Sequence, residues 1–323
     1  MSRVLTLALV FCLGVESVLA DEYPDEPLTM VVAFGVGGSA DRLARTVAPF
    51  LAEELGQPVQ VINKKGAGTL LGANFVLSRP DDGYTLFCSS FSPYLSNTIL
   101  EGNAAYTIED FAYLNFQWFD EDLIATPRGS KFTDLPALLD EIRTNPKTVR
   151  ASVVRGSTGH LMIKLLLELQ GIDQDALNLV TYNNGGAARA AVAGGVVDFT
   201  VISAKGSESI REFISPIAFN SSQRSEAWDA PTIQQALRGI VEVPVLPGSI
   251  RGFATTAKFR SQHPERFEKL ELALKRALEN EELQAILARA EIGARWTGSE
   301  QSKEIMQETF NIFRSYSHLL SII

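Results

Sequence analysis

Hydrophobic and polar positions follow two different periods along this chain. Short apolar runs rich in β-branched residues, such as Leu28–Phe34, indicate buried strands. Stretches with apolar residues at every third or fourth position, such as Asp41–Leu55, indicate helices. Further strands are expected at 59–62, 84–89, 149–154, 177–182 and 196–202, and further helices at 70–77, 135–142, 160–170 and 264–315. This alternation predicts an α/β fold with mostly parallel sheets.

Glycine-rich or hydroxyl-rich turns join several of these strands to the helices that follow. Such a turn exposes helix N-terminal N–H groups, which lack intrahelical partners and lie at the positive end of the helix dipole. Glycine also lets a ligand approach the backbone closely, and Ser39, Ser157 and Thr158 add hydroxyl donors. The pattern therefore favours anion binding, although tight turns without a ligand fit it as well. The turns are 35–40, 66–68, 156–159 and 183–186.

The regular alternation loosens at 111–126, where the sequence FAYLNFQWFDEDLIAT is aromatic and extended. We interpret this segment as a passage between two domains. A second α/β unit follows, in which Thr133 is expected to cap the helix at 135–142. The sequence thus predicts a first domain of residues 21–122 and 225–323 and a second domain of residues 123–224.

Residues 1–20 have the features of an export signal. Arg3 provides the positive start, residues 4–15 an apolar segment, and Val18-Leu19-Ala20 a cleavage site. A membrane anchor is the alternative, but it needs about 20 apolar residues and Glu16 interrupts the run. We therefore expect a periplasmic protein cleaved after Ala20. Cys88 is then the remaining cysteine, expected as a small core residue.

Composition and charge narrow the classes of function. The 323 residues are 46% hydrophobic and 21% charged, which suits a globular protein with a sizeable core. Acidic residues outnumber Lys and Arg by 38 to 29, and the net charge of -9 argues against a nucleic-acid binder. An anionic ligand must therefore be attracted locally, by backbone N–H groups or by one or two cations.

The sequence argues against three kinds of enzyme. The segment GVGGSA at 35–40 matches a dinucleotide-binding pattern, but the second strand ends in Asn63-Lys64-Lys65 without the acid that a ribose needs. A Ser157 and His160 hydrolase is opposed by the two residues lying within one helical turn. Three histidines and no HExxH motif leave no usual zinc set. We expect no catalytic residue, no metal and no cofactor.

Sequence blocks spread over nearly the whole mature chain carry a family resemblance. In order they are VVAFGVGGSADRLAR, GQPVQVINKKGAGTLLGA, PDDGYTLFCSS, TDLPALLDEIRTNPKTV, GSTGHL, YNNGG with AGGVVD, APT at 230–232 and RGF at 251–253. Each block alone is weakly specific, but the occurrence of all of them in this order is highly specific. The chain resembles the substrate-binding receptors of the tripartite tricarboxylate transporter family, also called Bug-type receptors.

The resemblance implies a two-domain periplasmic binding protein of the Venus-flytrap type, each domain a mixed sheet flanked by helices. It implies a monomer that closes on a small carboxylate and delivers it to membrane permease subunits, with a two-component sensor as the alternative partner. The identity of the ligand's distal half stays open, because Ala33, Gly35 and Val36 replace family prolines and Asn183 a frequent lysine. The implied ligand-binding residues are Phe34, Gly37, Gly38, Ser39, Asp41, Ala67 and Ser89 in the first domain, and Ser157, Thr158, His160, Tyr182 and Asp198 in the second.

Overall fold

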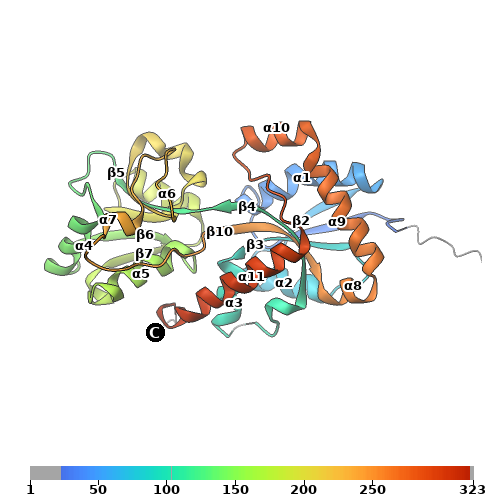
Figure 1. Cartoon of the computed structure of the whole chain (residues 1–323), viewed down its shortest axis with the longest axis horizontal. Helices are drawn as coiled ribbons and strands as arrows, with labels where there is room; N and C mark the ends of the chain where they lie inside the picture. The colour runs from blue at the N-terminus through green and yellow to red at the C-terminus, as the bar shows by residue number, and fades with distance from the viewer. Residues whose placement is uncertain (1–22, 103, 321–323) are drawn as a thin grey trace, which may run out of the picture.

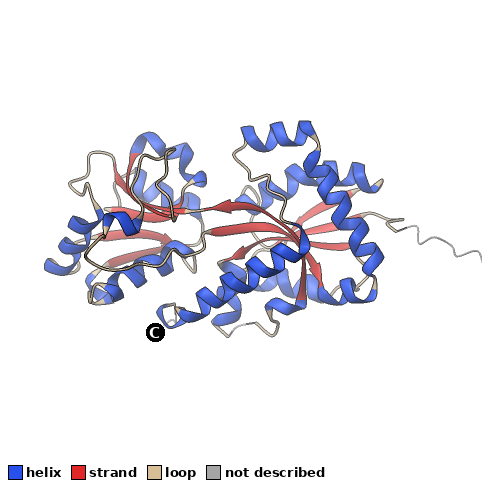
Figure 2. Cartoon of the chain, viewed as in Figure 1, coloured by secondary structure: helices blue, strands red, loops and turns tan. Residues whose placement is uncertain are grey.

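The computed structural model describes residues 23–102 and 104–320, which form two lobes lying side by side (Figure 1). Each lobe is built around one five-stranded sheet with helices packed against it (Figure 2). The expected export segment, residues 1–20, lies outside the described residues. No helix in the described part of the chain is both long enough and apolar enough to cross a bilayer.

The sheet of the first lobe is mixed, as the family resemblance implied. Its first three strands are parallel, while β10 runs antiparallel to both β3 and β4. Because β4 is antiparallel to β10, it runs in the same direction as β3. The strands in spatial order are β2 (Val59–Asn63), β1 (Leu28–Val32), β3 (Thr85–Ser92), β10 (Ser249–Thr256) and β4 (Phe111–Asp120).

The sheet of the second lobe repeats this plan. Strand β6 is parallel to β7 and β8, and β5 is antiparallel to β8 and β9. The strands in spatial order are β7 (Asn178–Tyr182), β6 (Arg150–Val154), β8 (Phe199–Ser203), β5 (Asp122–Pro127) and β9 (Ile214–Asn220).

The helices divide between the lobes with their sheets. The first lobe has α1 (Ser39–Leu55), α2 (Leu70–Leu77), α3 (Tyr94–Leu100), α8 (Ala257–Gln262), α9 (Pro264–Glu279), α10 (Glu281–Arg289) and the start of α11 (Gly298–Ser315). The second lobe has α4 (Leu135–Thr144), α5 (Thr158–Leu169), α6 (Gly185–Ala193) and α7 (Ile233–Ala236). Helix α4 is capped by Asp134, whose carboxylate accepts the Ala137 N–H at 2.8 Å, so the expected cap at Thr133 was one residue early.

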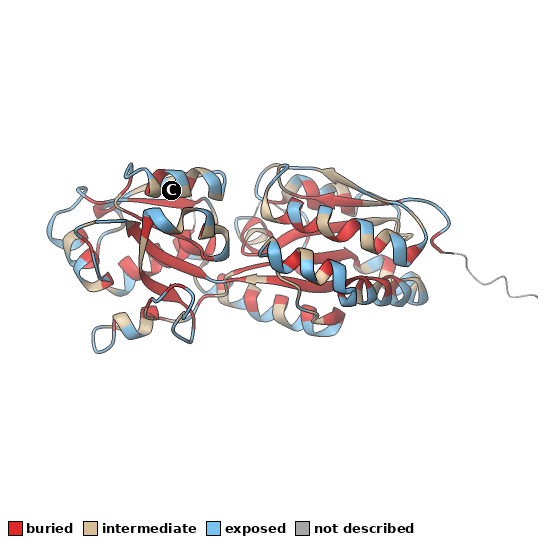
Figure 3. Ribbon diagram, turned by 90° about the horizontal axis from the view of Figure 1, so that it is seen from above, coloured by how far each residue is buried: buried red, intermediate tan, exposed pale blue. Residues whose placement is uncertain are grey.

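Strand β1 shows why its sequence is apolar at consecutive positions. Met30 and Val32 pack into the core on the α1 and α9 side, whereas Val31 packs on the opposite face with residues of α2 and α3. Side chains alternate between the faces of a strand, so a sheet covered on both sides needs apolar residues throughout. Figure 3 shows the strands buried and the outer helix faces exposed. Cys88 of β3 is a buried core residue, as expected, and burial raises the pKa of its thiol.

The passage expected at 111–126 is present, but it consists of two regular strands. Strand β4 ends at Asp120 and β5 begins at Asp122, so Glu121 alone lies between the two sheets. A second passage returns through residues 221–248 to β10. The two passages touch, since a Cβ placed on Gly248 would lie 2.2 Å from the Asp120 carbonyl oxygen.

The return to the first lobe comes later than the boundary expected at residue 225. Trp228 lies in a hydrophobic cluster with α6 and β8, and Ile233 and Leu246 lie in the cluster beneath α4 and α5. These apolar side chains bury themselves against the second lobe, so the core of that lobe continues to Leu246. The sequence between β9 and β10 has no strand pattern that would indicate where the chain leaves the second lobe.

Helix α11 belongs to both lobes. Its Met306 packs into the first-lobe core, whereas Phe313 and the following Leu319 and Leu320 lie in the core of the second lobe. Figure 1 shows the helix running from one lobe toward the other. The lobes are therefore joined by this helix in addition to the two passages.

Candidate functional site

The carboxyl-terminal edges of the two sheets face each other. Strand β4 leaves the first sheet at the edge where β1, β2 and β3 end, because it runs in their direction. Strand β5 enters the second sheet at the edge where β8 ends, because Asp122 pairs with Ser203. We call this meeting of the two edges the interlobe junction. Ligands of open α/β sheets bind outside the carboxyl ends of strands, which makes the junction the candidate site.

The turn after β1 offers N–H groups to the junction. Gly37 has a φ of 80°, which a side chain would strain, and its N–H donates to the Asp41 carboxylate at 2.8 Å. Gly38 caps α1 with an ordinary φ of -69°. Arg42 is the first residue of α1 whose N–H reaches a backbone carbonyl, that of Gly38, at 2.9 Å. Within the described residues, the N–H groups at the start of the helix, including that of Ser39, have no backbone partner, which is the arrangement that suits an anion.

The turn after β6 is the counterpart in the second lobe. Ser157 caps α5, and its hydroxyl oxygen accepts the His160 backbone N–H at 3.1 Å. Thr158 donates its hydroxyl to the Pro247 carbonyl at 2.9 Å, which ties the turn to the returning passage. The amide of Asn97 in α3 reaches the Gly156 carbonyl at 2.5 Å. A first-lobe helix therefore already contacts the second-lobe turn.

Asp41 has a structural role that accounts for its position. Its buried carboxylate accepts hydrogen bonds from the Gly37 N–H, the Asn63 amide and the Arg45 guanidinium. Burial favours the neutral acid, but these donors outweigh burial and lower the pKa of Asp41. The carboxylate shapes the turn after β1, and a second anion would be repelled by it, so we reassign Asp41 from ligand contact to support of the turn.

His160 is a neutral residue of the turn. Its Nδ1 accepts the Gly156 N–H at 3.3 Å, and burial together with the nearby Lys164 and Arg155 lowers its pKa to about 4. The imidazole does not activate Ser157, whose hydroxyl meets only the His160 backbone within the described residues. The geometry therefore argues against a serine hydrolase.

The lowered pKa of His160 predicts a pH dependence of stability. An unfolded histidine titrates near 6.5, so protonation favours the unfolded chain once the pH falls below that value. Between pH 7 and pH 5 this histidine should reduce the free energy of unfolding by about 2 kcal/mol. Urea unfolding of the wild type and His160→Gln at both pH values measures the difference. Equal pH dependence in the two proteins would contradict a neutral, buried imidazole.

The other expected residues, three from the first lobe and one from the second, lie around the junction in different environments. Phe34 follows β1 and packs its ring edge-on against Tyr94, with centroids 5.4 Å apart. Ala67 is exposed in the turn after β2, with a φ of 45°. Ser89 is buried in β3 opposite Gly252, and its hydroxyl has no hydrogen-bond partner within the described residues. Tyr182 ends β7 at the junction edge of the second lobe and is half-buried.

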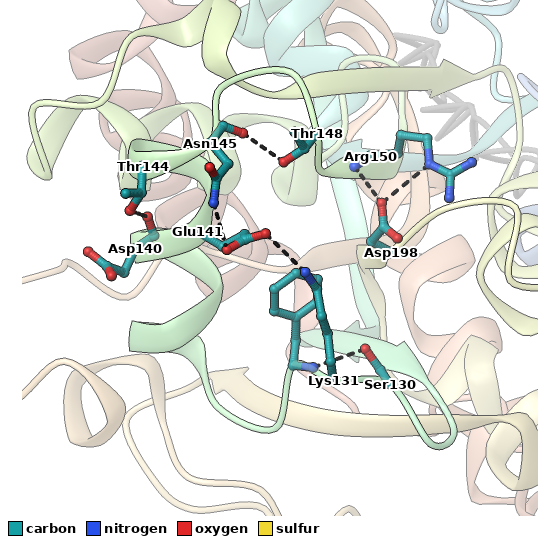
Figure 4. Close-up of polar contacts among 10 residues, drawn as sticks. Ser130, Lys131, Asp140, Glu141, Thr144, Asn145, Thr148, Arg150 and Asp198 are labelled. Atoms are coloured by element: carbon teal, nitrogen blue, oxygen red, sulfur yellow. Dashed lines mark hydrogen bonds and ion pairs between the residues drawn. The ribbon is translucent and has the colours of Figure 1, made fainter.

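Asp198 does not lie with the others. It precedes β8, and its carboxylate accepts the Arg150 N–H at 2.8 Å and pairs with the Arg150 guanidinium at 3.3 Å (Figure 4). Arg150 begins β6, so this ion pair sits at the amino-terminal edge of the second sheet. The junction is at the opposite edge, and the assignment of Asp198 to ligand binding is corrected accordingly.

Four residues of the junction were missed by sequence reasoning: Tyr94, Asn97, Asp122 and Arg189. Tyr94 and Asn97 belong to the short helix after β3, which the hydrophobic pattern does not predict. Asp122 is buried at the start of β5, inside the segment interpreted as a loose passage. Arg189 interrupts the Ala-rich helix α6. A single large polar residue in a helix of small ones was the signal that could have indicated it.

Comparisons with known proteins agree with this geometry. The profile of the tripartite tricarboxylate transporter family receptors matches residues 43–316. Protein BugT of Bordetella pertussis is 34% identical over 183 residues, which are 56% of this chain and 55% of BugT. The matched region thus spans about half the length of this curated relative.

Solved structures show the same fold over nearly the whole chain. MatC of Rhodopseudomonas palustris, with bound malate, superposes with a TM-score of 0.75 at 22% identity, covering 91% of this chain and 100% of MatC. Another R. palustris protein, with adipate, superposes with a TM-score of 0.74 at 21% identity, covering 92% and 98%. At these identities the structures establish the two-lobed fold.

Proposed function

This chain belongs to the receptors of the tripartite tricarboxylate transporter family, and from that premise we propose that it is an extracytoplasmic receptor for a small carboxylate. The carboxylate would bind at the interlobe junction and pass to the membrane subunits of a transporter. Family membership also confirms the prediction of a receptor rather than an enzyme. Export with cleavage after Ala20 and a monomeric state are parts of the same proposal.

The observation that carries the proposal is the pairing of two helix N-termini from different lobes. Helices α1 and α5 both begin at the junction edge of their sheets, at Ser39 and Thr158. Each provides N–H groups without intrahelical partners and the positive end of a helix dipole, which together suit a carboxylate. This explains how an acidic protein attracts an anion. The R. palustris relatives that hold malate and adipate are consistent with such a ligand.

Binding at the junction should require the lobes to separate. The Asn97 amide and the Gly156 carbonyl now meet across it at 2.5 Å, so a ligand must displace or surround this contact. A ligand held by both lobes then favours the closed form through its differential affinity. Thermal-shift measurements with mono-, di- and tricarboxylates against matched neutral amides test the proposal. Stabilisation by no carboxylate would overturn it.

Gly38→Val tests the first-lobe turn directly. A Cβ at Gly38 would lie 3.2 Å from the Gly35 carbonyl oxygen, and its φ of -69° accepts a side chain. The Gly35 carbonyl must move by a few tenths of an ångström and the N-cap is weakened, so the chain should still fold at a cost of about 1 kcal/mol while the valine covers the N–H groups beside it. Affinity for a carboxylate should fall at least tenfold, which is about 1.4 kcal/mol. Calorimetric titration measures this loss, and wild-type affinity would remove the turn from the site.

A further inference from the structure

Arg189 is a cation at the junction that forms no ion pair within the described residues, although Asp120 and Asp122 lie near enough to act on its charge. Its Nε donates to the Ser207 hydroxyl at 3.0 Å, and one terminal nitrogen, Nη2, donates to the Ser203 hydroxyl at 2.9 Å. No carboxylate lies within ion-pair distance of it in the described chain, and the other terminal nitrogen, Nη1, has no hydrogen-bond partner there. Burial lowers the pKa of this guanidinium. Burying a charge without a paired anion costs free energy, so binding of an anion beside Arg189 would be favourable.

The side chain is held in place by the backbone around it. A Cβ on Gly185 would lie 2.6 Å from Nη1 of Arg189, and a Cβ on Gly206 would lie 2.1 Å from Nη2. The guanidinium therefore lies between the backbone at Gly185 and the backbone at Gly206. Any residue larger than glycine at either position would collide with it. Gly185 begins α6 directly after β7, at the junction edge of the second sheet. The hydrogen bonds of Nε and Nη2 and these two close backbone approaches hold the guanidinium near the start of α6.

Tyr94 approaches the same place from the first lobe. Its ring packs against Phe34 of the first-lobe turn and against the second-lobe cluster that includes Ala188. Its hydroxyl has no hydrogen-bond partner within the described residues. Burial raises its pKa to about 12, an effect that Arg189 opposes from nearby. The phenol therefore stays protonated and can donate a hydrogen bond next to the guanidinium.

The acids of the junction leave Arg189 available. Asp120 accepts the Lys205 N–H at 3.0 Å and faces Arg251 at 3.5 Å. Burial and the neighbouring Asp120 raise the pKa of Asp122 to about 7 against the pull of Arg251 and Arg189, so about half of it is neutral near that pH. Glu121 accepts the Ser221 hydroxyl. Within the described residues, none of these carboxylates forms a hydrogen bond or an ion pair with Arg189.

We propose that Arg189 and Tyr94 form a second subsite, which binds a second carboxylate and makes this receptor selective for dicarboxylates. The inference rests on the proposed function, in which the turns at α1 and α5 hold the first carboxylate. A ligand with one carboxylate would fill the turns and leave Nη1 of Arg189 unpaired. A dicarboxylate would satisfy both. Arg189 is therefore a specificity-determining residue.

Calorimetric titration with succinate and butyrate tests the subsite, since the two ligands share a four-carbon chain and differ by one carboxylate. Wild type should bind succinate about thirtyfold tighter, the effect of one charged hydrogen-bonded pair. Arg189→Gln should abolish this preference and keep butyrate affinity. Tyr94→Phe should reduce it several-fold.

Gly185→Ala covers the case in which Arg189→Gln fails to fold. It keeps the arginine and adds one methyl group that must displace Nη1, so succinate affinity should fall while butyrate affinity stays. Gly186→Ala is the matched control, because its Cβ meets the Asn184 side chain at 3.3 Å and not Arg189. Succinate preference retained in both Arg189→Gln and Gly185→Ala overturns the subsite alone. Wild type that binds neither acid overturns the proposed function and the subsite with it.

Discussion

Gly159→Ala is expected to destabilise the second lobe by about 3 kcal/mol or more and to abolish ligand binding. A Cβ at this position would lie 2.2 Å from the Val201 carbonyl oxygen and 2.7 Å from its carbon. Both are backbone atoms of β8 and cannot move aside as a flexible side chain would. Helix α5 would have to lift from the sheet, which would carry the second-lobe turn away from the junction.

Urea unfolding and calorimetric titration of the same samples measure both losses. Gly186→Ala again provides the control, because it adds an equal methyl group to the first turn of α6 with its nearest contact at 3.3 Å. That variant should unfold within about 0.5 kcal/mol of the wild type. If Gly159→Ala matched it, the close approach of α5 to β8 would be wrong.

Asp122→Asn is expected to stabilise the unliganded protein by about 4 kcal/mol at pH 8. Burial raises the pKa of Asp122 from 3.8 to about 7, and Asp120 adds to the shift. The folded chain therefore holds a proton that the unfolded chain releases, so the stability that the neutral acid retains below about pH 4 is lost as the pH rises through 7. Asparagine keeps the shape and avoids the charge.

The test is the difference in unfolding free energy between Asp122→Asn and wild type at pH 8 and at pH 4. It should shrink from about 4 to below about 1 kcal/mol. Because His160 is present in both proteins, its opposing titration cancels from the difference. A difference that stays constant with pH would mean that Asp122 is not the buried acid described.

Sequence patterns predicted the parts of the fold that depend on local periodicity. Strand β1 is predictable because both of its faces are buried, which makes its residues apolar at consecutive positions. Helix α1 is predictable because one side of it is buried, which makes it apolar at every third or fourth position. The turns at Gly37 and Ser157 are predictable because glycine between a strand and a helix indicates a tight turn, and a hydroxyl residue there indicates a helix cap. These features depend only on residues that are close to one another in the sequence.

The junction depended on contacts between distant segments, which no local pattern reports. An arginine in a helix is common, so its sequence context does not single out Arg189. Its role becomes apparent only because Gly206, which belongs to a different element, leaves space for its guanidinium. Asp198 follows a family motif, but the parallel register of β6 and β8 places it at the edge away from the junction. Trp228 belongs to the second lobe only through packing that the irregular return passage conceals.

The C-terminal helix should determine how fast a ligand is captured. Phe313 of α11 and the following Leu319 and Leu320 lie in the second-lobe core, although α11 begins on the first lobe. Because α11 packs on both lobes, separating them would expose apolar side chains of this segment to water. The open form is therefore disfavoured in the absence of ligand. Ligand then enters through a minor population, and the observed association rate should level off at the rate of opening instead of rising with ligand concentration.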